Sequence, residues 1–107
     1  MAIIQMNSEL FKKHVKEGAK PVMVEYWAPW CVYCRRIGPT VPKIAEQFED
    51  RITVAQVNID ENGSLAEQEK IEVIPTFVIY QNGEPLGSIT APDSKAKLEA
   101  FIEETLK

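Results

Sequence analysis

Residues 22–34 of this 107-residue chain read Val22-Met23-Val24-Glu25-Tyr26-Trp27-Ala28-Pro29-Trp30-Cys31-Val32-Tyr33-Cys34. Apart from Glu25, the first six residues are apolar on both alternating faces, which is typical of a strand buried in the centre of a sheet. The two cysteines follow where a helix is expected to begin. Free backbone N–H groups and the positive dipole end at a helix N-terminus favour a thiolate at Cys31. Cys34 lies one turn further along the same face, so the two sulfurs can bond.

The two cysteines are better suited to redox chemistry than to cross-linking. A disulfide across so short a loop adds little stability through chain entropy. The alternative is a pair of buried thiols that pack as small hydrophobic side chains. A closed zinc site needs four ligands, whereas the sequence offers two cysteines and one distant histidine, His14, so we expect no metal. His14 lies on a polar helix face and is expected to play no part.

Strand-like and helix-like patterns alternate on both sides of this segment. We expect strands over residues 3–6, 21–27, 52–58, 76–80 and 86–90, and helices over about 9–18, 31–48, 62–70 and 94–106. Pro39 and Pro42 predict a kink or break in the second helix. Asn82-Gly83 predicts a hairpin between the last two strands. This order predicts a single α/β domain over residues 1–107, with a mixed sheet covered by helices on both faces.

The composition argues against several classes of partner. Lys and Arg total 12, Asp and Glu total 16, and the net charge is −4. Nucleic acids and anionic membranes bind clustered positive charge, so neither is expected as the main partner of these scattered charges. No apolar run approaches the roughly 20 residues that a membrane span needs. Residues 1–7 lack the basic and apolar parts of a signal peptide, so we expect the protein to work in the cytoplasm.

Several motifs resemble those of the thioredoxin family over nearly the full chain. They are residues 24–31, Cys34 with Pro39 five residues later, Val57-Asn58-Ile59-Asp60, Ile74-Pro75-Thr76 and Asn82-Gly83. The resemblance implies a thioredoxin fold, with a central mixed five-stranded sheet flanked by four helices. It also implies dithiol–disulfide exchange with protein substrates, no cofactor of its own, a flavin-dependent thioredoxin reductase as electron donor, and a monomer.

The resemblance assigns roles to individual residues. Cys31 is expected to attack a substrate disulfide, and Cys34 to resolve the mixed disulfide by attacking Cys31. Pro75 is expected to be cis, although base rates for a proline at a strand start favour trans. Ile74 is expected to pair its backbone with the substrate as an added strand. Trp30 is expected to lie partly exposed beside the first cysteine.

Glu25 is the residue for which the sequence leaves two readings open. On a central strand it should be buried with a raised pKa, and it would then accept the proton of Cys34. The alternative is a strand glutamate that reaches solvent or pairs with a lysine. The family has a buried acid at this position, usually Asp in thioredoxins and usually Glu in disulfide isomerases.

The chain departs from the family pattern at three places. Val32-Tyr33 separates the cysteines, where reducing thioredoxins usually have Gly-Pro, isomerases Gly-His and glutaredoxins Pro-Tyr. Tyr33 supplies no positive charge, so we expect a reduction potential at or somewhat above about −270 mV and well short of about −120 mV. Gln56 replaces the usual lysine near the buried acid, which should raise the pKa of that acid further. Ala91 replaces a usual glycine, and its methyl group should narrow the substrate groove.

The sequence therefore predicts a protein-disulfide reductase. The expected catalytic residues are Cys31, Cys34 and Glu25, and the expected substrate-binding residues are Trp30, Val32, Tyr33, Ile74, Pro75 and Ala91. Two alternatives stay open. A disulfide oxidase or isomerase fits Glu25 and the unusual dipeptide, whereas a non-catalytic binding module would dock a partner without turnover. A Cys31→Ser variant separates them, because only the binding module would keep its function.

Overall fold

The computed structural model describes residues 3–107, so Met1 and Ala2, which belong to the expected domain and to the N-terminal segment discussed above, lie outside the described residues. A five-stranded sheet in the order β1-β3-β2-β4-β5 forms the centre. Its strands are β1 (Ile4–Gln5), β2 (Val22–Trp27), β3 (Thr53–Asn58), β4 (Thr76–Gln81) and β5 (Glu84–Thr90). β1, β3 and β2 run parallel, whereas β4 is antiparallel to β2 and β5 is antiparallel to β4. The expected mixed sheet of five strands is confirmed.

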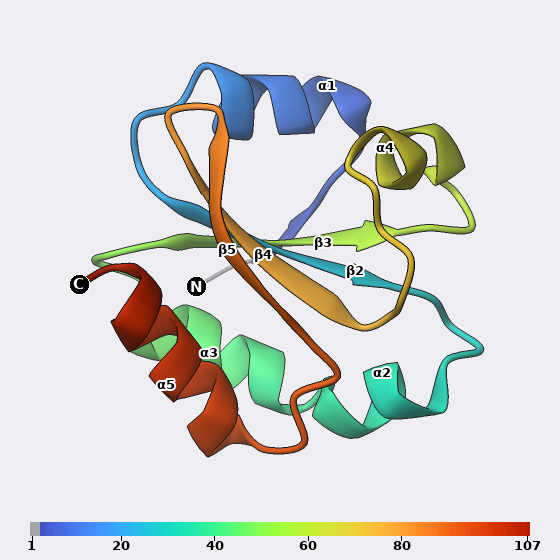
Figure 1. The fold of residues 1–107 in the computed structure, drawn as a ribbon, viewed down its shortest axis with the longest axis vertical. Helices are drawn as coiled ribbons and strands as arrows, with labels where there is room; N and C mark the ends of the chain where they lie inside the picture. Colours follow the sequence, from blue (N-terminus) through green and yellow to red (C-terminus); the bar gives the residue numbers. More distant parts are fainter. Residues whose placement is uncertain (1–2) are drawn as a thin grey trace.

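Helices cover both faces of the sheet (Figure 1). On one face lie α1 (Ser8–Phe11), its π-helical continuation η1 (Lys12–Lys16) and α4 (Gly63–Gln68). On the other face lie α2 (Val32–Ile37), α3 (Thr40–Gln47) and α5 (Lys95–Thr105). The expected number of four helices is wrong, because residues 3–107 contain five α-helices. The difference arises where one helix was expected over residues 31–48.

Gly38 and Pro39 divide that expected helix into α2 and α3. The N–H of Gly38 still donates to the carbonyl of Cys34 at 2.9 Å, which completes the last turn of α2. Pro39 has no N–H to continue the hydrogen bonds of the helix, and its ring clashes with the carbonyl group one turn earlier. Pro42 falls in the first turn of α3, where a missing N–H costs nothing because the N–H groups there have no partner within the helix. Pro39 therefore marks a full break between the two helices, whereas Pro42 is accommodated within α3.

The two strands of the β4–β5 hairpin are longer than expected, and the turn between them is correspondingly short. Asn82 and Gly83 both have positive φ angles, +54° and +82°, as a two-residue type I′ turn requires. The strands consequently pair as far as Gln81 and Glu84. β5 thus begins two residues before the expected start.

Apolar side chains fill the space between the sheet and each layer of helices. β2 contributes Met23 to the layer under α3 and α5, and Val24 and Tyr26 to the layer under α1. Burying one such side chain stabilises the fold by about 1.5–3 kcal/mol. β2 is buried on both faces, as expected of a central strand, and Glu25 is its one charged residue.

A chain of polar contacts crosses the layer under α1. The hydroxyls of Tyr26 and Tyr80 lie 2.7 Å apart, and the Tyr80 hydroxyl donates to the carboxylate of Glu69 at 3.0 Å. A carboxylate only accepts, so Tyr80 donates to Glu69 and must accept from Tyr26. Burial raises the pKa of both tyrosines well above the ordinary value, which keeps both hydroxyls protonated.

Candidate active site

The register of the sheet brings four segments together at one end. Trp27 at the end of β2 lies beside Asn58 at the end of β3, and the neighbouring Tyr26 pairs with Thr76 at the start of β4. Thr76 in turn pairs with Thr90 at the end of β5. The segments 28–34, 59–62, 73–75 and 91–94 therefore emerge at the same end of the sheet. They contain every predicted site residue except Glu25.

Cys31 and Cys34 form a disulfide at the start of α2, with their Cα atoms 5.2 Å apart. Cys31 is the N-cap of the helix, and its Sγ accepts a hydrogen bond from the backbone N–H of Cys34 at 3.2 Å. The same N–H would stabilise a thiolate on Cys31 once the disulfide is reduced. Both residues are buried, with exposed fractions of 6% for Cys31 and 4% for Cys34. The predicted redox pair is therefore placed at a helix N-terminus.

The segment before β4 lies against the first cysteine. The Ile74–Pro75 peptide bond is cis, as the family resemblance implied. The carbonyl oxygen of Ile74 lies 3.8 Å from Sγ of Cys31. Within residues 3–107, Ile74 takes part in no backbone–backbone hydrogen bond, whereas the carbonyl of Pro75 accepts from the N–H of Ala91 at 2.8 Å. The backbone of Ile74 is thus available to an added strand beside the sulfur.

Glu25 is buried, with 2% of its surface exposed, and it forms no ion pair within residues 3–107. Its Oε1 accepts a hydrogen bond from Nε2 of Gln56 at 2.8 Å. Burial raises the pKa of Glu25 from 4.5 to about 7, while the Gln56 hydrogen bond opposes the rise. The solvent-exposed and lysine-paired readings of Glu25 are therefore wrong, and the buried reading with a raised pKa is confirmed.

A cavity of about 180 Å³ connects the surroundings of Glu25 with those of Cys34. It is lined by Glu25, Trp27, Cys34, Arg35, Gly38 and Gln56. The indole N–H of Trp27 is buried and has no hydrogen-bond partner within residues 3–107. A buried carboxyl with a pKa near neutrality and the second cysteine thus share one partly polar space.

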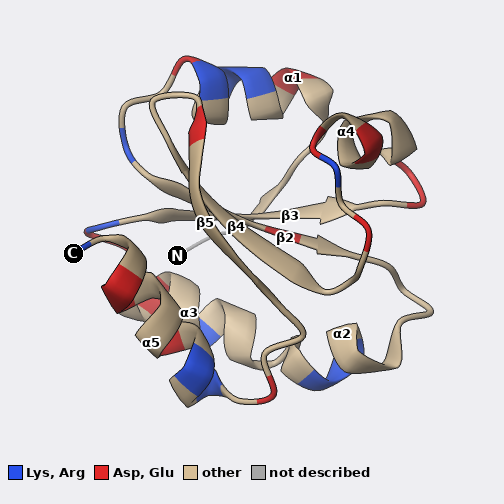
Figure 2. Cartoon of the chain, in the orientation of Figure 1, with Lys and Arg blue, Asp and Glu red and all other residues tan. Residues whose placement is uncertain are grey.

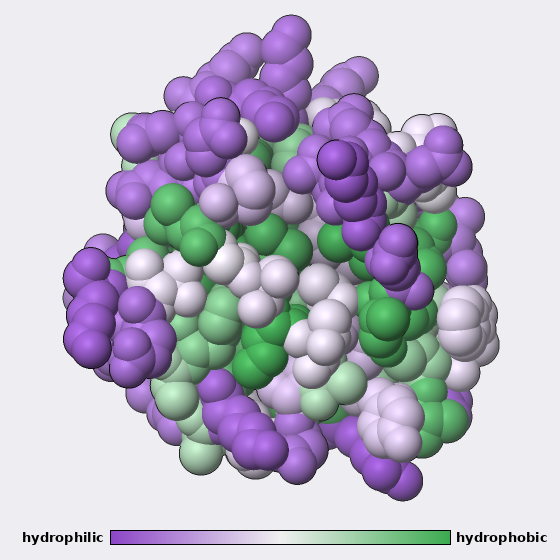
Figure 3. All heavy atoms as spheres, viewed as in Figure 1, coloured by the Kyte–Doolittle hydropathy of each residue, from purple (hydrophilic) through white to green (hydrophobic). Residues whose placement is uncertain are grey.

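Exposed aromatic and apolar side chains surround the cysteines. Trp30 is 64% exposed and Tyr33 61%, and Val32 and Val73 are exposed as well. The indole N–H of Trp30 donates to both carboxylate oxygens of Asp60 at 3.1 Å, which ties the ring to the segment after β3. Figure 3 shows apolar and weakly polar atoms at the surface over the region of α2. Such a surface is typical of an interaction site.

Comparison with known proteins matches this geometry to one family. The model of the Thioredoxin family matches residues 2–104. The chain is 38% identical to Thioredoxin 1 of a Nostoc species over 105 residues, which are 98% of each chain. It is 40% identical to Thioredoxin 1 of Synechococcus elongatus over 96 residues, which are 90% of each chain. The chain belongs to the thioredoxin family.

This thioredoxin-family member is accordingly a thiol–disulfide oxidoreductase, of the enzyme class of protein-disulfide reductases. None of the helices between residues 3 and 107 combines the length and apolar composition needed to cross a lipid bilayer. In the same range, no three His, Cys, Asp or Glu side chains gather as they would around a metal ion. His14 lies in η1, across the sheet from α2.

Ala91 replaces the usual glycine at a position where the backbone is left-handed. Its φ angle is +45°, in the left-handed region that favours glycine. Its side chain is exposed and lines a hollow of about 480 Å³ beside α2, together with Tyr33 and Arg36. The methyl group thus faces the surface where the groove was expected, and its effect on substrate binding stays a prediction.

Sequence reasoning missed several residues of this thioredoxin-family site. The contact between Asp60 and Trp30, the exposure of Val73 and the place of Arg35 in the cavity were not predicted. The motif that ends in Asp60 was noticed, but no local pattern places residue 60 beside residue 30. Trp27 belongs to the strand predicted to be buried, and its unpartnered N–H gives no signal in the sequence.

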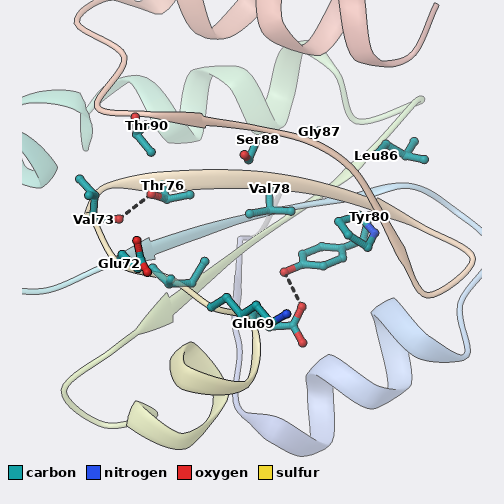
Figure 4. A pocket seen from close by; sticks show the side chains of 13 residues that line it. Glu69, Glu72, Val73, Thr76, Val78, Tyr80, Leu86, Gly87, Ser88 and Thr90 are labelled. Atoms are coloured by element: carbon teal, nitrogen blue, oxygen red, sulfur yellow. Dashed lines mark hydrogen bonds between the residues drawn. The ribbon is translucent and has the colours of Figure 1, made fainter.

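A further hollow, of about 410 Å³, lies between β5 and residues 69–73 (Figure 4). Tyr80 and Glu69, which share a hydrogen bond, both line this hollow. None of the predicted site residues lines this hollow, although Val73 and Thr76 at one end flank the Ile74–Pro75 segment. It holds no cysteine, so it is separate from the redox pair.

Proposed function

We propose that this protein reduces disulfides in other proteins through Cys31 and Cys34. The observation that carries the proposal is the cysteine pair at the start of α2, with Sγ of Cys31 lying against the unpaired backbone of Ile74. A substrate strand that pairs with Ile74 would carry its own disulfide to Cys31. The apolar surface around the pair would hold such a segment.

The reaction proceeds in two exchange steps. The Cys31 thiolate attacks one sulfur of the substrate disulfide, forms the mixed disulfide and releases the other substrate sulfur as a thiolate. The Cys34 thiolate then attacks Sγ of Cys31 and forms the Cys31–Cys34 disulfide. The remaining substrate sulfur leaves as a thiolate, so the substrate gains two electrons and the protein loses two.

The surroundings of the two sulfurs support this order of attack. Sγ of Cys31 lies near the Ile74 carbonyl and accepts the backbone N–H of Cys34, which favours its thiolate. Cys34 instead lines the cavity that it shares with Glu25. In our proposal the Glu25 carboxylate accepts the proton of Cys34 as that thiol attacks. A carboxyl with a pKa of about 7 is suited to this role near neutral pH.

The partners and the compartment follow from the same proposal. A flavin-dependent thioredoxin reductase would return two electrons to the Cys31–Cys34 disulfide after each cycle. A disulfide reductant works where thiols are kept reduced, so we propose the cytoplasm as its compartment. We also propose a monomer, as the family resemblance implies. Acid quenching of cells followed by alkylation would find the pair mainly as thiols, and a mainly oxidised pair would contradict this placement.

Variants of the two cysteines test the mechanism. Cys31→Ser is expected to abolish reduction of a disulfide-bonded protein such as a two-chain hormone, because no nucleophile remains. Cys34→Ser is expected to accumulate a mixed disulfide that a non-reducing gel separates from the free protein. A Cys31→Ser variant that still performs the protein's function in the cell would favour the non-catalytic binding module instead.

A disulfide oxidase or isomerase is the second candidate function, and the buried Glu25 favours it through the family pattern. The reduction potential separates the two candidates. Equilibrating the protein in graded dithiol buffers and counting alkylated thiols by mass measures it. A midpoint below about −250 mV supports the reductase, whereas one above about −200 mV supports the oxidase or isomerase.

A further inference from the structure

α2 carries two neighbouring cations directly after the second cysteine. Arg35 and Arg36 are both exposed, and neither forms an ion pair within residues 3–107. The chain as a whole carries a net charge of −4, and η1 is a second exposed basic segment, on the other face of the sheet. Figure 2 shows the two arginines as the blue part of α2. Two arginines without ion-pair partners in residues 3–107 thus lie on the helix that begins at the nucleophile, Cys31.

Arg36 borders the hollow of about 480 Å³ beside α2. Its guanidinium lies over the ring of Tyr33, 5.4 Å from the ring centroid. Stacking of this kind orients a guanidinium and leaves its N–H donors free for a planar anion. Asp93 is the acidic residue lining the hollow, and its carboxylate lies 3.2 Å from Nζ of Lys97. Within residues 3–107, Arg36 and Asp93 form no ion pair with each other.

Exposed acids lie in the segments that follow β3 and precede β4. Asp60 holds the Trp30 ring there, and Glu61 and Glu72 are exposed in the neighbouring segments. Figure 2 shows these acidic segments after β3 and before β4, apart from the basic part of α2. The segments after β3 and before β4 thus carry exposed acids, with Lys70 between them, whereas α2 carries two exposed arginines.

We propose that Arg36 and the hollow beside α2 bind an acidic side chain of the substrate, close in sequence to the cysteine that Cys31 attacks. This inference rests on the proposed reductase function and specifies the substrate class within it. Arg36 follows Cys31 by five residues, which is about 7.5 Å along a helix. An extended chain covers that length in about two or three residues. The preferred substrate therefore carries Asp or Glu two or three residues from its reactive cysteine.

Four synthetic peptides test this specificity. They are identical except for Glu, Gln, Leu or Lys two residues from a cysteine that carries a thionitrobenzoate disulfide, whose release is coloured. Single-turnover rates with pre-reduced protein at low salt are expected to be about fivefold higher for Glu than for Gln, as an exposed ion pair provides, and lowest for Lys. The preference for the Glu peptide is expected to shrink in about 0.5 M salt, because salt screens interactions between surface charges.

Two matched variants locate the preference. Arg36→Gln is expected to bring the ratio of Glu to Gln rates to about one. Lys13→Gln removes the same charge from exposed η1, on the other face of the sheet, and is expected to keep the full ratio. Far-UV circular dichroism and a thermal melt check that both variants fold.

Every other outcome overturns the inference. Equal rates for the four peptides would reject an acidic subsite while leaving the reductase proposal intact. A fastest Leu peptide would make the hollow an apolar subsite, and a ratio that survives in Arg36→Gln would place the preference elsewhere. Loss of the ratio in Lys13→Gln would mean that the Glu preference comes from the net charge of the protein and not from Arg36. Failure to reduce any peptide would reject the proposed function itself.

Discussion

Replacing the buried carboxyl of Glu25 by the amide of glutamine should make this protein more stable at neutral and alkaline pH. The folded state raises the pKa of Glu25 from 4.5 to about 7, and desolvation is the largest cause. The carboxyl is only 2% exposed, so solvent screens this effect little. At about 1.4 kcal/mol per pKa unit, the difference corresponds to about 3 kcal/mol.

The sign of the effect follows from where the proton binds more tightly. The folded protein holds the Glu25 proton more strongly than the unfolded chain does, so this group's contribution to stability is fully present below pH 4.5. It is lost as the pH rises through about 7, because a buried carboxylate then forms without an ion pair in residues 3–107. A neutral amide makes no such transition.

Urea unfolding of the oxidised wild type and of Glu25→Gln between pH 4.5 and 8.5 measures this difference. The disulfide stays closed, so cysteine ionisation does not contribute. The stability of the variant relative to wild type should increase by about 3 kcal/mol across that range. Subtracting the two curves cancels the contributions of other carboxyls to the pH dependence. One of them is Glu99, whose pKa is lowered by its hydrogen bond from Lys95, so that its contribution to stability is lost towards acid pH.

Glu46→Gln is the matched control for this experiment. Glu46 is an exposed glutamate on α3, so its replacement removes the same charge from the surface. Its effect should stay within about 0.5 kcal/mol at every pH. A Glu25→Gln curve that changes by less than about 1 kcal/mol between the two pH limits would refute the reasoning from burial.

Three more predictions follow from other contacts. Glu25→Gln should slow resolution of the mixed disulfide by Cys34 about tenfold or more near pH 7, measured by stopped flow, because the proton acceptor is missing; an unchanged rate would remove Glu25 from the mechanism. Tyr80→Phe should destabilise by about 2 kcal/mol and Tyr26→Phe by about 1, because only the first change leaves a buried hydroxyl without its acceptor; urea unfolding decides the order. Ala91→Gly should stabilise by about 0.5 kcal/mol, since relief of the left-handed conformation exceeds the entropy that glycine adds to the unfolded chain; a lower melting temperature would contradict this.

Local features of the chain could be predicted well from the sequence. The central strand, the start of the helix at Cys31 and the Asn82-Gly83 hairpin each depend on neighbouring residues. Pro39 also signalled an interruption, yet the sequence did not distinguish a kink from a break. That choice depended on Gly38 completing the last turn of α2 before Pro39 ended the ladder. The count of four helices failed for that reason.

The sequence by itself determined that two thiols meet at a helix N-terminus, because three residues of helix bring them together whatever surrounds them. Only the tertiary structure decided what lies around those thiols. The carbonyl of Ile74, 43 positions after Cys31, reaches the sulfur because β4 pairs with β2 in one register. The cavity between Glu25 and Cys34 depends on how α2 packs against the sheet. Contacts between distant residues follow from register and packing, which no local pattern encodes.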